Sequence, residues 1–135
     1  MLPPPTHYVR GVDGSDIAYQ VGGVVKTTGD GVLAVFDSPS RAVPAALAAR
    51  DALGREGITI RAGVHTGEIE RRGDDIGGIA VHLAARIESA ADPGEVLVSR
   101  TVRDLTTGGR LRLEPRGTRS FKGIPDAWDV FAAVT

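Results

Sequence analysis

The chain of 135 residues contains no cysteine, which excludes disulfides, thiolate metal sites and a cysteine nucleophile. Aromatic residues make up only 4% of it, and this scarcity argues against a platform on which nucleic-acid bases stack. The net charge is −1, so no overall field draws the protein to nucleic acid or to an anionic membrane. We therefore expect no nucleic acid and no membrane among its partners.

Long apolar runs are also missing. No stretch approaches the ~18 apolar residues that a membrane span needs. The start, Met1–Thr6, has neither the basic region nor the apolar run of a signal peptide. A cytoplasmic protein of one domain is the expectation, and a chain of this length buries roughly two thirds of the surface that its unfolded form exposes.

The sequence does contain an alternation of strand and helix patterns. Residues 24–27 and 32–36 are apolar and meet at an Asp30-Gly31 turn, which predicts a hairpin. Ser38-Pro39 is typical of a helix start, and this helix is expected to run to Glu56. Further strands are predicted over 58–65, 95–99, 110–114 and 128–134, and further helices over 76–91 and 101–107. This order predicts an α/β two-layer sandwich, with one sheet and helices on one face.

Four polar residues have informative places in this pattern. Asp30 lies at the tip of the predicted hairpin, where an acid is pre-positioned to hold a cation, and Lys26 lies four residues earlier in the same ribbon. His82 and Arg86 are one turn apart on the same side of the 76–91 helix. An acid and three basic side chains on regular elements favour the binding of something anionic.

Five segments resemble, in order and spacing, the catalytic domain of the class III nucleotidyl cyclases, which make a cyclic mononucleotide from a nucleoside triphosphate. The segments are Val25–Gly31, Ile60–Glu68, Asp75–Ile87, Pro93–Ser99 and Phe121–Ile124. The resemblance covers residues 23–135. It implies the ferredoxin-like two-layer sandwich of that family.

The resemblance also implies roles in metal and base binding. Asp30 matches one of two carboxylates that hold two Mg²⁺ or Mn²⁺ ions on the triphosphate, where the cations lower the pKa of the attacking 3′-hydroxyl. Lys26 and Asp75 match the pair that recognises adenine through N1 and the 6-amino group, and guanine reverses both polarities. Plain alternatives stay open: a turn residue for Asp30, a solvated lysine for Lys26 and a helix cap for Asp75.

Three further residues match positions that contact the phosphates or the ribose. Arg86 matches the arginine that meets the charge developing on the α-phosphate, with a solvated helix arginine as the plain alternative. His82 stands where most of the family has asparagine, and it can still donate an N–H to a ribose or phosphate oxygen. Lys122 matches the lysine that binds the β,γ-phosphates. His65, on the polar side of its strand, is interpreted as structural.

The chain departs from the family at its start. The family domain opens with a strand that carries its first metal aspartate, followed by two helices, and the residues before Gly23 are too few for these elements. Residues 1–22 are expected to be a tail or replacement strands, and His7–Gln20 resembles the opening strands of an α/β-hydrolase domain. The hydrolase function itself is excluded, because the Gly-x-Ser-x-Gly elbow is missing.

The segment that ends at Gln20 is joined to the predicted hairpin by a short connection, and the length of this connection predicts how the two pair. Only residues 21–23 intervene, which favours an antiparallel pairing with Val24–Thr27 and argues against Asp16 as the missing metal carboxylate. The sheet would then lack one wall and present an open edge that invites pairing with another chain.

The resemblance implies a truncated class III adenylate cyclase domain that converts ATP to 3′,5′-cyclic AMP and pyrophosphate. Its expected partners are ATP and a second cyclase domain, in a homodimer or a heterodimer. Because the first metal aspartate is missing, the activity of the chain by itself stays open. The alternative is a non-catalytic module that binds nucleotide or pairs with intact cyclase domains.

Overall fold

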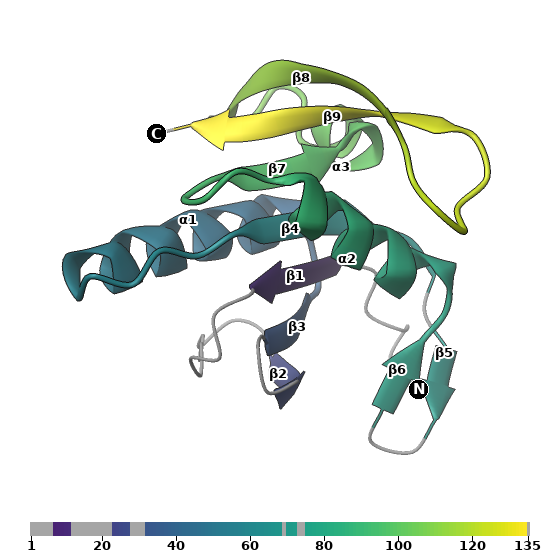
Figure 1. Ribbon diagram of the computed structural model, residues 1–135, viewed down its shortest axis with the longest axis horizontal. Coiled ribbons are helices and arrows are strands. Elements are labelled where there is room, and N and C mark those ends of the chain that lie inside the picture. Colours follow the sequence, from purple (N-terminus) through teal and green to yellow (C-terminus); the bar gives the residue numbers. More distant parts are fainter. Residues whose placement is uncertain (1–6, 12–22, 28–31, 69, 73–74, 135) are drawn as a thin grey trace.

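The structure is a computed structural model that describes residues 7–11, 23–27, 32–68, 70–72 and 75–134. Within these residues a seven-stranded sheet of order β2-β3-β1-β4-β7-β9-β8 packs with three helices, and β5 and β6 form a separate ribbon (Figure 1). The elements are β1 (His7–Gly11), β2 (Gly23–Thr27), β3 (Val32–Phe36), α1 (Pro39–Arg55), β4 (Ala62–Thr66), β5 (Glu70–Arg72), β6 (Asp75–Gly77), α2 (Ile79–Ala90), β7 (Val96–Ser99), α3 (Arg100–Leu105), β8 (Arg112–Ser120) and β9 (Ala127–Val134).

The predicted hairpin and the helix after it are confirmed. β2 and β3 pair antiparallel, and α1 begins directly after Ser38 with Pro39 in its first turn. Proline is tolerated there because the first helical N–H groups have no partner within the helix. The side chain of Ser38 makes no capping hydrogen bond, so the proline and the buried face of α1 define this start.

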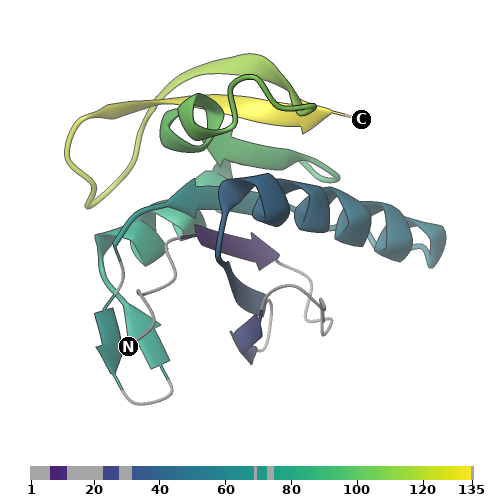
Figure 2. The ribbon, with the colours of Figure 1, turned by 180° about the vertical axis from the view of Figure 1, so that it is seen from behind.

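The two faces of the sheet are covered by different helices. Alternate residues of a strand point to opposite faces, and Ala34 and Phe36 pack with α1 whereas Leu33 and Val35 pack with α2. In Figure 1, α2 lies in front of the sheet and α1 behind it, and Figure 2 shows the reverse side. The prediction of helices on one face only is therefore wrong. Because both faces are covered, β4 and β7 are buried along their whole length.

Three apolar clusters form the core, and we name each by its position. The α1 cluster consists of Ala34, Phe36, Ala42, Val43, Ala46, Leu47, Ala62, Val64, Val96, Val98, Val102 and Ala133. On the opposite face, the Leu33 cluster consists of Leu33, Val35, Ala80 and Ala84. The Leu83 cluster consists of Leu83, Ile87, Ala91, Leu97, Val130 and Ala132, and Phe121, Ile124 and Trp128 pack against it.

Strand β1 lies inside the sheet, antiparallel to both of its neighbours. Gly11 is the cross-strand partner of Val32 in β3 and of Ala62 in β4. The expected pairing of residues 16–20 with Val24–Thr27 falls on residues outside the described ranges. The expectation of an open edge is wrong on this side of the sheet, since β3 pairs with β1 there. The reason is that α1 leaves β3 and β4 one strand apart, and β1 supplies the hydrogen-bonding partners that both strands need. Asp16 lies outside the described residues.

Helix α2 begins three residues later than the periodicity predicts. Asp75–Gly77 is the strand β6, paired with β5, and the N-cap of α2 is Gly78 with φ 110°. Only glycine adopts such a φ readily, so the Gly77-Gly78 pair separates the strand from the helix. Asp75 is therefore not the cap of this helix. No helix within the described ranges is long and apolar enough to cross a membrane.

Candidate nucleotide site

Helix α2 presents the two predicted catalytic side chains on its solvent side. Its buried face consists of Ala80, Leu83, Ala84, Ile87 and Glu88. His82 and Arg86 are both exposed, and side chains four residues apart are neighbours on a helix surface. The structure thus brings these two residues together, as their spacing predicts.

The environment of the Arg86 guanidinium differs from that of Arg100 and of Arg116. Arg100 forms ion pairs with Asp104 and Asp129 at 3.6 and 3.8 Å, and Arg116 pairs with Glu95 at 3.2 Å. Among the described residues, no carboxylate forms an ion pair with Arg86. Its planar set of N–H donors is therefore open to an anionic ligand on this side of the molecule.

Helix α2 is held very close to β4 at one glycine. A Cβ atom on Gly63 would lie 2.4 Å from the backbone N of Glu88 and 2.5 Å from the carbonyl O of Ala84. Only glycine fits between the two backbones, and this contact fixes the height of α2 above the sheet. The same contact therefore fixes the position, relative to the strands, of the exposed side of α2 that carries His82 and Arg86.

The strands that carry Lys26 and Asp75 contact each other. β2 lies against β6, and the ladder between β2 and β3 has a bulge between Val24 and Lys26. The bulge brings position 26 opposite Leu33, whose side chain packs with α2. Bulges commonly re-aim a strand in this way next to functional sites. The two positions expected to recognise the base thus lie on strands that contact each other.

Lys122 occupies an exposed turn between β8 and β9. The N–H of Ile124 donates to the carbonyl of Phe121 at 3.1 Å, which closes a four-residue β-turn. Gly123, the third residue of this turn, has φ 81°, and a type II turn requires a positive φ at that position. Phe121 and Ile124 pack against the Leu83 cluster, which includes two buried residues of α2. Figure 1 shows this loop beside α2. The structure therefore joins the Lys122 turn to the helix that carries Arg86.

The predicted metal ligand Asp30 lies outside the described residues. Within the described part of the chain, no group of three or more histidine or acidic side chains could hold a metal ion. The described residues alone therefore do not form a site for Mg²⁺ or Mn²⁺.

His65 is a buried neutral histidine, in agreement with its structural interpretation. Its side chain is 5% exposed, and burial lowers its pKa from 6.5 to about 4. Nδ1 lies 2.8 Å from Oγ of Ser99, which accepts the N–H of Val102 and so caps α3. Because Ser99 accepts that N–H, its own proton is free to donate to Nδ1 of His65. Sequence reasoning missed Ser99, whose only signal was its place before a predicted helix.

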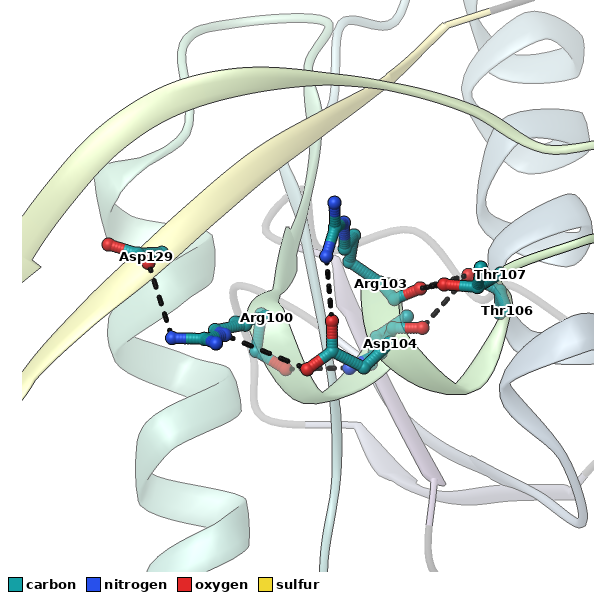
Figure 3. Close-up of polar contacts among 8 residues, drawn as sticks. Arg100, Arg103, Asp104, Thr106, Thr107 and Asp129 are labelled. Atoms are coloured by element: carbon teal, nitrogen blue, oxygen red, sulfur yellow. Dashed lines mark hydrogen bonds and ion pairs between the residues drawn. The ribbon is translucent and has the colours of Figure 1, made fainter.

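A second polar region lies at α3 and does not suit a nucleotide. A cavity of about 390 Å³ is lined by Arg100, Asp104, Asp126, Trp128 and Asp129, among others. Figure 3 shows Arg100 between the carboxylates of Asp104 and Asp129. Three carboxylates against one guanidinium would repel a triphosphate, and exposed pairs of this kind contribute little to stability.

Comparison with known proteins defines the family. The family model for the adenylate and guanylate cyclase catalytic domain matches residues 18–132. The chain is 39% identical over 95 residues to a putative adenylate cyclase 3 of Rhizobium meliloti (strain 1021), covering 64% of this chain and 16% of that protein. It is 33% identical over 108 residues to an adenylate cyclase of Glutamicibacter nicotianae, covering 78% of this chain and 27% of that protein.

The fold agrees with this match. A crystal structure of an adenylate/guanylate cyclase/hydrolase from Silicibacter pomeroyi superposes with a TM-score of 0.79 at 25% identity, over 98% of this chain and 99% of that chain. The chain belongs to the class III adenylate and guanylate cyclase catalytic domains, and its sheet with helices is the fold of that family. It spans only 16% and 27% of the two curated relatives.

Proposed function

We propose that this domain binds ATP and takes part in its conversion to 3′,5′-cyclic AMP and pyrophosphate, as one half of a dimeric site. The observation that carries the proposal is the presentation of His82 and Arg86 on the open side of α2, with the Lys122 turn packed against the same helix. A cytoplasmic location remains a prediction from the sequence.

Each basic side chain has a place in this reaction. The 3′-oxygen forms a bond to the α-phosphorus and loses its proton, while the bond from that phosphorus to the pyrophosphate oxygen breaks. Arg86 would stabilise the negative charge on the α-phosphoryl oxygens in the transition state. Lys122 would hold the β,γ-phosphates, and His82 would donate a hydrogen bond to a ribose or phosphate oxygen.

Lys26 and Asp75 would select the base. An ammonium that donates to adenine N1 and a carboxylate that accepts from the 6-amino group would each face a like partner in guanine. The contact between β2 and β6 supports this pairing, because it brings the two strands together. ATP is accordingly the proposed substrate.

The divalent cation, Mg²⁺ or Mn²⁺, is proposed to bind at Asp30. Asp30 lies outside the described residues, so this assignment rests on the match of residues 25–31 to the family segment.

The partner is proposed to be a second copy of this chain or another cyclase domain. If the metal half of this chain is defective, its homodimer should be slower than a complete domain by at least ~10³, because electrostatic stabilisation of the transition state usually contributes most of the catalysis in such sites. In the alternative, a non-catalytic module, the chain would bind nucleotide or pair with intact domains without turnover.

The experiment measures cyclic AMP formed from ATP and Mn²⁺ by the purified chain, alone and mixed with a complete cyclase domain that lacks its own transition-state arginine. We expect weak formation by the chain alone and restored formation in the mixture. ATP binding without cyclic AMP in either sample would favour the non-catalytic module. An absence of both nucleotide binding and association with the second domain would refute the proposal.

A further inference from the structure

The β8–β9 loop is anchored at both ends. On the side of β8, Phe121 and Ile124 flank Lys122 and pack against the Leu83 cluster. On the side of β9, the indole N–H of Trp128 donates to the carbonyl of Pro125 at 3.3 Å. The exposed lysine is therefore carried by a short segment that the body of the domain holds on both sides.

Trp128 rests on His65. The two ring centroids are 5.4 Å apart with an interplanar angle of 86°, the edge-to-face arrangement that aromatic rings prefer. Trp128 also packs against the Leu83 cluster, so this one side chain contacts the loop, the cluster and the central strand β4. A shift of His65 would be passed to the loop through the indole ring.

His65 in turn is fixed from two other directions. Its Nδ1 is hydrogen-bonded to Ser99 at the junction of β7 and α3. Beside Nε2 lies Gly67, where an added Cβ would be 3.4 Å from that atom and 2.9 Å from Cβ of Ala80 in α2. The ring of His65 lies beside the hydroxyl of Ser99, the indole of Trp128 and the backbone of Gly67. All three groups are uncharged, which suits a neutral imidazole.

We infer that His65 is a positioning residue for Lys122: its ring forms the support on which Trp128 holds the β8–β9 loop beside α2. The inference rests on the proposed function for the role of Lys122 toward phosphate, and His65 itself touches no nucleotide. Through this support, Lys122 and Arg86 are held on one rigid unit. The spacing between the two cations, which a triphosphate would have to match, is then set by His65 and Trp128.

The chain offers an internal readout that requires no ligand. It has two lysines, Lys26 and Lys122, so the endoproteinase Lys-C cuts at one site in the loop and at one site far from His65 in the sequence. His65→Leu removes both the hydrogen bond to Ser99 and the aromatic contact. It should raise the rate of cleavage at Lys122 about tenfold, because cleavage follows the population of the opened loop, and leave Lys26 unchanged.

Three further variants separate positioning from general destabilisation. Val64→Ala alters the adjacent, equally buried residue that packs in the α1 cluster, and it should not favour cleavage at Lys122 over Lys26. His65→Asn, which keeps a hydrogen-bonding atom near the place of Nδ1, should restore part of the protection. If His65→Leu fails to fold, Trp128→Leu decides, because it removes the ring that rests on His65 together with the N–H that holds Pro125. It should then raise cleavage at Lys122 alone.

The second readout tests the link to phosphate. In the intact chain ATP should bind more tightly than AMP, and His65→Leu should reduce this ratio about tenfold, which is about 1.4 kcal/mol, while AMP binding is unchanged. Unaltered cleavage at Lys122 in the folded variants, or an equal rise at both lysines, would overturn the inference. An unaltered ATP-to-AMP ratio despite a loosened loop would overturn its link to phosphate. Failure of the unmodified chain to bind any nucleotide would instead overturn the proposed function, and the cleavage comparison would still decide the role of His65.

Discussion

The two faces of the sheet differ in how they are held together. On the face of α1, a single apolar cluster joins the helix to four strands. On the face of α2, two smaller clusters are present, with the glycine contact at Gly63 and the hydrogen-bonded pair of His65 and Ser99. The α2 face thus depends on a few specific contacts, whereas the α1 face depends on the sum of many interchangeable ones.

The outer surfaces of the two helices differ in a related way. On α1, Arg41 pairs with Asp37 at 3.4 Å and Arg50 with Asp51 at 3.0 Å. On α2, no described carboxylate forms an ion pair with Arg86. An arginine without an ion pair on the exposed side of a helix is available to an anionic ligand, and the proposed function assigns such a ligand to α2.

The largest expected effect concerns the seat of α2. Gly63→Ala would place a methyl group against the helix backbone, and we expect a loss of more than about 3 kcal/mol in the free energy of unfolding, at the upper end of overpacking costs. Gly54→Ala in α1 is the matched control, because nothing lies within 4 Å of its added Cβ. It should stabilise the protein by about 0.5–1 kcal/mol. Urea denaturation measures both, and equal effects would contradict the close seating of α2.

The next effect is the response of the α2 face to acid. The pKa of His65 is lowered from 6.5 to about 4 by burial, so between these values the unfolded chain binds a proton that the folded chain does not. Stability should therefore fall as the pH drops from 6.5 to about 4, by about 2–3 kcal/mol from this residue, and should not depend on His65 above pH 6.5. The measurement is urea denaturation at pH 7 and pH 4.5 for the unmodified chain and for His65→Asn. The same acid loss in both proteins would show that His65 is not buried in its neutral form.

A smaller effect sharpens the contrast between base and phosphate recognition. Lys26→Glu should reduce the preference for ATP over GTP by about 1–3 kcal/mol, the cost of one unpaired buried group. Lys122→Glu is the matched control, since a contact to the β,γ-phosphates should affect both nucleotides equally. Calorimetric titration of the two variants gives both values. Equal affinity for ATP and GTP in the unmodified chain would refute the base-recognition pair.

Local features of this fold could be predicted from the sequence. The pairing of residues 24–27 with residues 32–36 and the helix start at Ser38-Pro39 are determined by neighbouring residues, and both are present. The start of α2 was misplaced because Ile76 fits the helical period, although the following glycines end the pattern. The spacing of His82 and Arg86 within one helix was enough to place them together.

Long-range features could not be predicted in the same way. The place of β1 depends on strands more than 20 residues away, which local patterns do not encode. The burial of both faces of β4 was missed because Gly63 and His65 resemble a polar, solvated side. Ser99, Trp128 and His65 form one group although they are far apart in the sequence, so periodicity carried no signal for it.

The most direct test of the account asks whether α2 can serve a second domain. A complete cyclase domain without its transition-state arginine should be nearly silent, and mixing it with this chain, ATP and Mn²⁺ should restore cyclic AMP formation. Arg86→Ala in this chain should reduce the restored rate by at least ~10²-fold, whereas Asp30→Ala should leave it unchanged, because Asp30 would belong to the other site of the pair. If the two chains demonstrably associate and no cyclic AMP forms, or if Arg86→Ala has no effect on the restored rate, the α2 face is not the half-site proposed here.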